Sequence, residues 1–141
     1  MPANLVTGTD AEDVAAYVAQ AAARPGQDTG RLATIGQGPS NAVAKAKGGK
    51  LEIPTDPSGA LAYKFGSAEA PAGSLTVESK NDASVDHDIA IEGNGVNEKG
   101  DTVSGGGVST IDADLQPGEY TFYCTLPGHR AGGMEGKLTV K

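Results

Sequence analysis

Four side chains of this sequence have the chemistry to hold one metal ion together. The chain has one Cys, two His and one Met besides Met1, and they stand at His87, Cys124, His129 and Met134. Four residues separate Cys124 from His129, and four more separate His129 from Met134. One thiolate, two imidazoles and a distant thioether form the ligand set of type 1 (blue) copper sites, because Cu(I) favours soft sulfur and imidazole suits both oxidation states. The pattern therefore predicts one copper ion per chain with these four ligands.

Other uses of a Cys and two His explain less of the pattern. A catalytic Cys–His pair needs an exposed, activated thiolate and a third group that orients the base, and Met134 has no role in such a site. Zinc more often takes a fourth strong ligand instead of a thioether. We therefore expect no enzyme activity. A copper-binding or delivery protein with the same ligands remains as the alternative, and an exposed, exchangeable metal would distinguish it.

The ligands fall where strands are expected to end. Cys124 closes the alternating run EYTFYC, and the next strand is expected at 136–140, so that the segment TLPGHRAGG is the loop between them. This loop and its ends supply three ligands. Tyr120, Phe122 and Cys124 alternate onto one face of their strand, toward the core. His87 begins the run HDIAI and reaches the loop if the two strands are neighbours at one end of a sandwich.

Short alternating runs continue through the whole segment from Leu51 to the C-terminus, with the turn signals DPSG, APAG, GNG, SGGG and QPG between them. The composition agrees, because the chain has 21 Gly, only 4 Tyr and 2 Phe, and no Trp, which suits short strands joined by turns. We predict an all-β fold, a Greek-key β-sandwich of seven to eight strands, over residues 51–141.

The first third of the chain has a different character. Thr9 and Glu12 have capping-box spacing, apolar residues follow at helical intervals, and Pro25 and Gly26 form a stop signal, so a short helix is expected over about residues 10–23. The next stretch mixes Gly, Ser, Lys and Ala and predicts a linker. The expected organisation is therefore a helical segment at 1–25, a linker at 26–50 and a β domain at 51–141.

Residues 117–141, PGEYTFYCTLPGHRAGGMEGKLTVK, resemble the C-terminal signature of plastocyanins and related cupredoxins. The resemblance extends back to Leu51, and the four-residue gap between Cys and His is similar to that of the auracyanin group of bacterial blue copper proteins. It implies a cupredoxin fold and a role in carrying single electrons between redox partners. One position departs from the family. Asp88 stands where an Asn usually ties the two ligand-bearing loops together, and a carboxylate accepts hydrogen bonds but does not donate them.

The resemblance also implies where electrons pass. In the family, the second His emerges through an apolar patch that docks redox partners, and the corresponding positions and their neighbour are Gly59, Leu61, Leu126, Pro127 and Gly128. Tyr123 matches a residue at a second, remote electron-transfer site of plastocyanins, and Asp86 puts a charge at the rim of the patch. Expected partners are redox proteins such as cytochrome c or a membrane electron-transfer complex. The expected location is extracytoplasmic, in the periplasm, in the thylakoid lumen or at the cell surface.

Residues 1–22 resemble the end of a class I cytochrome c, in which the axial Met is followed by Pro, a short loop and a final helix. The chain has no C-x-x-C-H run, so it attaches no haem covalently. We hypothesise a cytochrome c–cupredoxin fusion, in which Met1 was the axial haem ligand and residues 26–50 are the tether that keeps haem and copper at high effective concentration.

Charge and hydropathy narrow the choice of partners. The chain has 18 acidic and 11 basic residues and a net charge of -7, so it lacks the positive charge that nucleic acids and anionic lipids attract. No apolar stretch approaches the roughly 20 residues of a membrane-spanning helix, and the first residues lack the features of a signal peptide. We expect no nucleic-acid partner and no membrane insertion.

Overall fold

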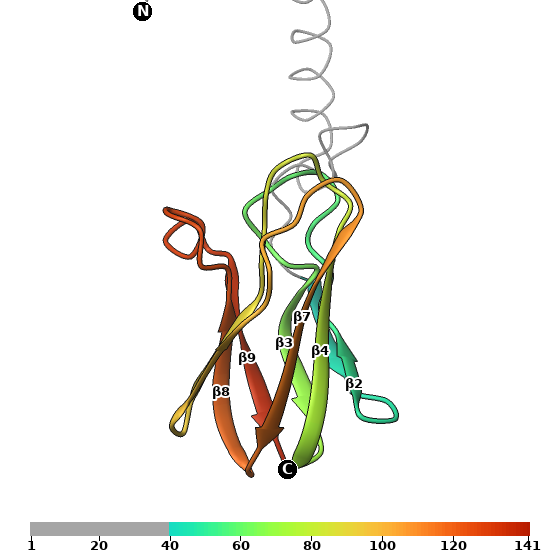
Figure 1. Ribbon diagram of the computed structural model, residues 1–141, viewed down its shortest axis with the longest axis vertical. Helices are drawn as coiled ribbons and strands as arrows, with labels where there is room; N and C mark the ends of the chain where they lie inside the picture. Colours follow the sequence, from blue (N-terminus) through green and yellow to red (C-terminus); the bar gives the residue numbers. More distant parts are fainter. Residues whose placement is uncertain (1–39) are drawn as a thin grey trace, which may run out of the picture. The chain divides into compact units, whose positions relative to one another are not determined.

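The computed structural model describes residues 40–141, which form two β-sheets packed face to face (Figure 1). The six-stranded sheet has the order β1-β3-β9-β8-β5-β6, and the three-stranded sheet has the order β2-β4-β7. The strands are β1 (Ser40–Lys45), β2 (Lys50–Glu52), β3 (Phe65–Ala70), β4 (Gly73–Asn81), β5 (Ala90–Gly93), β6 (Val96–Lys99), β7 (Gly107–Leu115), β8 (Gly118–Tyr123) and β9 (Glu135–Val140). The predicted all-β Greek-key sandwich is confirmed, with nine strands where seven to eight were expected.

Strand β1 corrects the expected boundary of the β domain. Residues 40–50 were assigned to the linker, but Ser40–Lys45 pair in parallel with β3. The prediction missed this strand because it lies at the edge of the sheet and only Ala44 is buried, so the apolar alternation of a strand is absent. Backbone hydrogen bonds hold the edge, as in the Ala46 N–H that donates to the Glu69 carbonyl at 2.9 Å. Residues 26–39 and the predicted helix lie outside the described residues.

The core lies between the two sheets and follows from the alternation of each strand. In β4, Leu75 and Val77 face inward while their neighbours are more exposed, as a period of two requires. In β8, Tyr120 and Phe122 are buried, followed by Cys124, which confirms the predicted inward face. The Tyr63 ring packs edge to face on Phe122, with ring centroids 5.4 Å apart. The core therefore reaches without interruption to the Cys at the end of β8.

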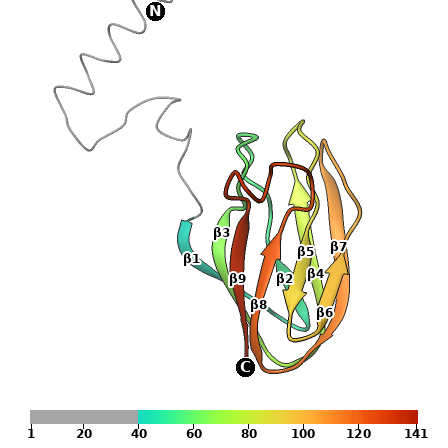
Figure 2. The ribbon, with the colours of Figure 1, turned by 90° about the vertical axis from the view of Figure 1, so that its left-hand side faces the viewer.

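The connections that bear the four predicted ligands lie at the end of the sandwich away from the C-terminus (Figure 2). Strand β4 ends there at Asn81, after a regular antiparallel register with β7. The Asn81 side-chain amide donates to the carbonyls of Val85 and Val103, each at 2.7 Å, and its oxygen accepts from the Ala83 N–H at 3.0 Å. A single buried side chain thus shapes the loop before His87 and ties it to the loop before β7.

Candidate metal centre

His87 is held in place through its backbone. It forms an isolated antiparallel bridge with Val103, in which the His87 N–H donates to the Val103 carbonyl at 3.0 Å and the Val103 N–H donates back at 2.8 Å. The strand predicted for HDIAI is therefore shorter than expected, because β5 begins only at Ala90. The bridge and the Asn81 bonds to the same loop leave the His87 side chain 1% exposed. Sequence reasoning missed Asn81, whose only signal is its place at the end of a strand before a turn.

The other predicted ligands lie on the loop between β8 and β9. The Cys124 N–H donates to the Met134 carbonyl at 3.1 Å, which closes the base of the loop, and the Met134 N–H donates to the His129 carbonyl at 3.0 Å. The loop passes close to Leu61 at Gly132, where a Cβ would lie 2.8 Å from Leu61 Cδ1 and 3.2 Å from the Gly128 carbonyl oxygen. These contacts fix where the loop turns and hold His129 above the end of the sandwich.

Three donor atoms from these two segments converge. The ligand atoms of His87, Cys124 and His129 all lie within 4.8 Å of one another. His87 Nδ1 is 3.2 Å from His129 Nδ1, and Cys124 Sγ is 3.4 Å from the same His129 nitrogen. Met134 is fully buried at the end of the same loop, and its place as a fourth ligand stays a prediction.

The chemistry of this donor set fits a metal ion. Two neutral imidazole nitrogens that face each other can share only one proton, and a thiol beside them offers only a weak donor, so lone pairs remain in excess. A soft cation satisfies all three atoms at once. The site is also nearly closed to water, since Cys124 and His87 are each 1% exposed and His129 is half-buried.

Residues 51–141 match the copper-binding proteins of the plastocyanin/azurin family. The chain belongs to this family. Among solved structures, it is similar to auracyanin from the photosynthetic bacterium Roseiflexus castenholzii, with 29% identity and a TM-score of 0.55 over 74% of this chain and 99% of that one. Auracyanin B has 24% identity and a TM-score of 0.59, covering 74% and 96% of the two chains. The blue copper protein auracyanin A from Chloroflexus aurantiacus has 19% identity and a TM-score of 0.56, covering 71% and 100%.

These matches confirm the cupredoxin fold, and the three converging donors are compatible with one type 1 copper. Residues 1–22, with their resemblance to a cytochrome c tail, fall outside both the matched and the described residues, so that resemblance remains an expectation. None of the residues 40–141 belongs to a helix long and apolar enough to cross a membrane.

The electrostatic environment of this cupredoxin site keeps His87 ready to bind a cation. Burial, followed by the neighbouring His129, lowers the pKa of His87, so its imidazole stays neutral. Burial raises the pKa of the Cys124 thiol, although the backbone amides of Asp88 and Leu126 act in the opposite direction. In the absence of a metal the thiol therefore keeps its proton, and a bound cation would release it.

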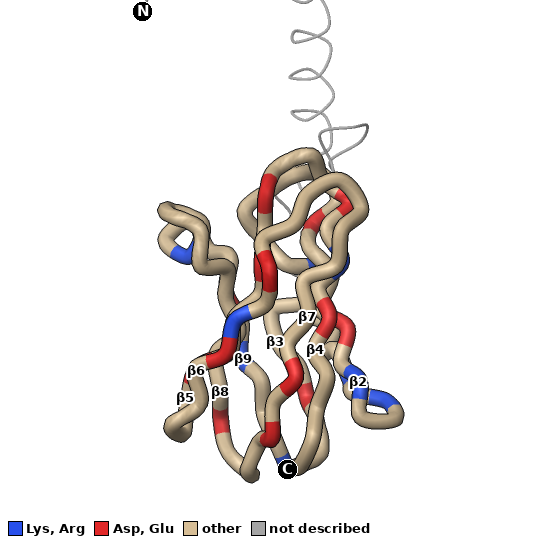
Figure 3. The backbone as a smooth tube through the Cα atoms, viewed as in Figure 1, with Lys and Arg blue, Asp and Glu red and all other residues tan. Residues whose placement is uncertain are grey.

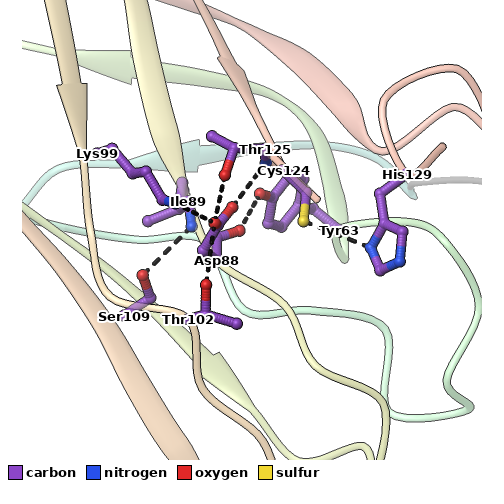
Figure 4. Close-up of polar contacts among 9 residues, drawn as sticks. All are labelled: Tyr63, Asp88, Ile89, Lys99, Thr102, Ser109, Cys124, Thr125 and His129. Carbon is purple, nitrogen blue, oxygen red and sulfur yellow. Dashed lines mark hydrogen bonds and ion pairs between the residues drawn. The ribbon is translucent and has the colours of Figure 1, made fainter. Parts of the chain in front are cut away.

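Asp88 ties the two ligand-bearing segments together despite its departure from the family pattern. Its carboxylate accepts from the Thr125 N–H at 2.7 Å and from the Thr125 hydroxyl at 2.5 Å (Figure 4). The Asp88 backbone carbonyl accepts from the buried Tyr63 hydroxyl at 2.6 Å. The segment after His87 is thereby joined to the residue that follows Cys124.

Among the predicted docking residues, Leu61, Pro127 and Gly128 lie at or on the exposed part of the ligand loop. Leu61, 37% exposed, lies against Gly132 of that loop, and Pro127 and Gly128 are exposed. A Cβ on Gly59 would touch Val85 at 4.0 Å, and Val85 is itself 42% exposed. Leu126 packs partly on the core. The structure thus adds Val85 to the apolar group, which the sequence alone did not assign.

Tyr123, the predicted second electron-transfer residue, is covered by Arg130. The Arg130 guanidinium lies 4.2 Å from the centroid of the Tyr123 ring, and it donates to Glu92 at 2.6 Å and to Glu135 at 2.8 Å. Hydrogen bonds to Glu92 and then to Glu135 raise the pKa of Arg130. Arg130 follows His129 directly, so this contact also fastens the ligand loop to β5 and β9. A role of Tyr123 in electron transfer stays a prediction.

Proposed function

We propose that this cupredoxin carries single electrons at a type 1 copper site held by His87, Cys124, His129 and Met134. The observation that carries the proposal is the convergence of two imidazole nitrogens and one thiol within 4.8 Å, in a chain of the copper-binding plastocyanin/azurin family. Bound copper would supply the one-electron Cu(II)/Cu(I) couple. The protein fixes the donor atoms in place, excludes water from them and presents a surface on which partners dock.

Enclosure of the site favours an electron carrier over a copper delivery protein. Cys124 and Met134 are 1% and 0% exposed, and the backbone bond between them closes the loop that carries them. A delivery protein needs a metal that a partner's ligands can reach and remove. Slow release of Cu(I) to an excess of a soluble chelator would support the carrier, whereas rapid release would favour delivery.

Partners, location and domain context extend this proposal. Leu61, Pro127 and their neighbours form an apolar face at the ligand loop, suited to a redox protein such as cytochrome c or a membrane electron-transfer complex. Acidic residues are spread along the whole sandwich and not gathered at one end (Figure 3), so we assign docking to the apolar face. We also propose that the protein lies outside the cytoplasm and that its cupredoxin domain is fused to a cytochrome c domain. A C-x-x-C-H codon run in frame upstream in the DNA would support the fusion, and its absence there would contradict it.

The decisive experiment is copper loading followed by optical spectroscopy. The protein with Cu(II) should show an intense visible band from thiolate-to-copper charge transfer, which ascorbate bleaches. Cys124→Ser should abolish the band because it removes the thiolate, whereas Met134→Leu, the matched control, should keep it because the axial thioether is a weak ligand. A colourless Cu(II) complex of the wild type would contradict the proposed function.

A further inference from the structure

The pocket around the Asp88 side chain consists of donors. One carboxylate oxygen accepts from the Thr125 N–H at 2.7 Å. The other accepts from the Thr125 hydroxyl at 2.5 Å and from the Thr102 hydroxyl at 3.4 Å, and lies 3.4 Å from Lys99 Nζ. Figure 4 shows these groups around the carboxylate, with Cys124 and His129 beyond it. The Asp88 side chain is 0% exposed, so protein groups alone satisfy it.

Lys99 decides that this pocket suits a carboxylate and not the amide usual in the family. An Asn at this position could turn its oxygen to the Thr125 N–H, and both hydroxyls could rotate to accept from its NH₂ group. The Lys99 ammonium has no acceptor to offer, so it would lose its partner in the pocket and turn to water, to which its side chain is 52% exposed. The position next to His87 is therefore built for a negative charge.

We infer that Asp88 is a positioning residue whose buried negative charge locks the two ligand segments together and favours the oxidised state of the bound copper. The inference rests on the proposed copper site. A fixed anion stabilises the more positive, oxidised site more than the reduced one, and low solvent exposure strengthens this interaction. Lys99 offsets the charge only in part, since its own side chain is 52% exposed and solvated.

Asp86 offers a natural comparison. It precedes His87 as Asp88 follows it, yet it is exposed to solvent. The two carboxylates have the same distance along the chain from the ligand and differ in burial.

The test compares Asp88→Asn with Asp86→Asn in the copper-loaded protein by cyclic voltammetry. Asp88→Asn should raise the reduction potential by at least about 59 mV, which corresponds to a tenfold change in the ratio of the Cu(II) and Cu(I) affinities. Asp86→Asn should shift it much less. Lys99→Gln, an exposed and well-tolerated change, should lower the potential, because it removes the cation that offsets Asp88. Equal shifts in the two Asp variants, or a rise in Lys99→Gln, would overturn the redox part of the inference.

The tie itself is tested without copper. In the metal-free protein, Asp88→Ala should speed hydrogen exchange of the Thr125 amide and lower the free energy of unfolding, because it removes the acceptor of the Thr125 N–H. Asp88→Asn should have a smaller effect, since its side-chain oxygen can still accept that bond. Unchanged Thr125 exchange in Asp88→Ala would overturn the tie. A wild type that forms no coloured copper complex would instead contradict the proposed function, and the Thr125 exchange rate would still decide whether Asp88 ties the segments.

Discussion

The two ligand-bearing segments of this cupredoxin have opposite environments. The segment of His87 and Asp88 is buried and is bonded to Val103, Thr125 and Tyr63. The loop that contains His129 is exposed over most of its middle, including Pro127 and Gly128. Three of the proposed ligands, His87, Cys124 and Met134, thus belong to the core, and His129 lies at the boundary with the surface. The difference teaches that the buried residues fix the donor positions, whereas the middle of the loop is the part that meets solvent and the proposed partners.

Removing each His in turn should produce the largest contrast. His87→Gly and His129→Gly should both lose the charge-transfer band on loading with Cu(II). Added imidazole should restore it in His129→Gly, because loss of a half-buried ring opens the site to solvent. In His87→Gly the vacated space is closed to solvent. Recovery of the band should therefore need roughly tenfold more imidazole, which corresponds to a binding free energy weaker by about 1.4 kcal/mol.

An imidazole titration followed by visible absorption measures both variants. Equal recovery would show that the two segments are equally accessible, which would break the comparison between them.

Met134 sharpens the comparison because it is a buried residue of the exposed loop. Met134→Leu should raise the reduction potential, since the loss of a donor in an apolar site favours the less charged Cu(I) state, and Met134→Gln should lower it through a harder oxygen donor. A tenfold change in relative affinity corresponds to about 59 mV. Voltammetry should give the order Leu above Met above Gln, and a Leu variant with an unmoved or lowered potential would mean that Met134 is not the axial ligand.

Tyr63→Phe tests the buried segment through stability. The change keeps the ring on Phe122 but leaves the Asp88 carbonyl without its donor, which should cost about 1–3 kcal/mol of unfolding free energy. Burial raises the pKa of Tyr63, so the native phenol stays protonated when that of the unfolded chain ionises. Wild-type stability should therefore fall above a pH of about 10, and the gap between the proteins should narrow.

Denaturant unfolding at neutral and at alkaline pH measures the loss of unfolding free energy in Tyr63→Phe and the fall in wild-type stability with pH. Tyr120→Phe is the control, because its hydroxyl donates to the Gln116 carbonyl at 2.9 Å in a partly exposed place and should cost less. An equal loss of unfolding free energy in both variants would mean that the hydrogen bond to the buried segment contributes no more than a partly exposed one.

Leu61→Glu tests the exposed segment through electron exchange. A charge in the apolar group beside the ligand loop should slow exchange with a redox protein several-fold, while the visible spectrum stays unchanged because Leu61 is not a ligand. Stopped-flow mixing with a cytochrome c measures the rate. Val108→Glu is the control, since Val108 is 42% exposed on β7 of the other sheet. Equal slowing in the two variants would mean that overall charge, and not this face, governs docking.

Arg130→Gln should have the smallest effect on stability, because exposed ion pairs contribute only about 0–1 kcal/mol each. Its effect on Tyr123 should be larger, since the ring loses its cover and should be nitrated faster by tetranitromethane. Lys141→Gln, which removes an exposed pair with Glu69, is the control for stability alone. An unchanged nitration rate in Arg130→Gln would show that Tyr123 is already open to solvent and accessible to a partner.

The convergence of His87, Cys124 and His129 was predictable from the sequence because these residue types at this spacing are typical of one metal site. Cys124, His129 and Met134 share one loop between recognisable strands, and only His87 had to be placed by topology. The features that the sequence did not predict depend on how segments far apart in the chain pair with one another. Strand β1 is held by backbone bonds to β3 and has almost no apolar pattern. The bridge of His87 to Val103 and the contact of Lys99 with Asp88 join residues that no local pattern connects.

The hydrogen bond from the Cys124 N–H to the Met134 carbonyl closes the ligand loop at its neck, directly beyond the pairing of Tyr123 with Glu135. The strand pairing below this neck does not depend on the loop residues, and the free energy of closing a loop varies only slowly with its length. A loop of another length, grafted between Cys124 and Met134, should therefore leave the sandwich folded and alter only the site that it encloses.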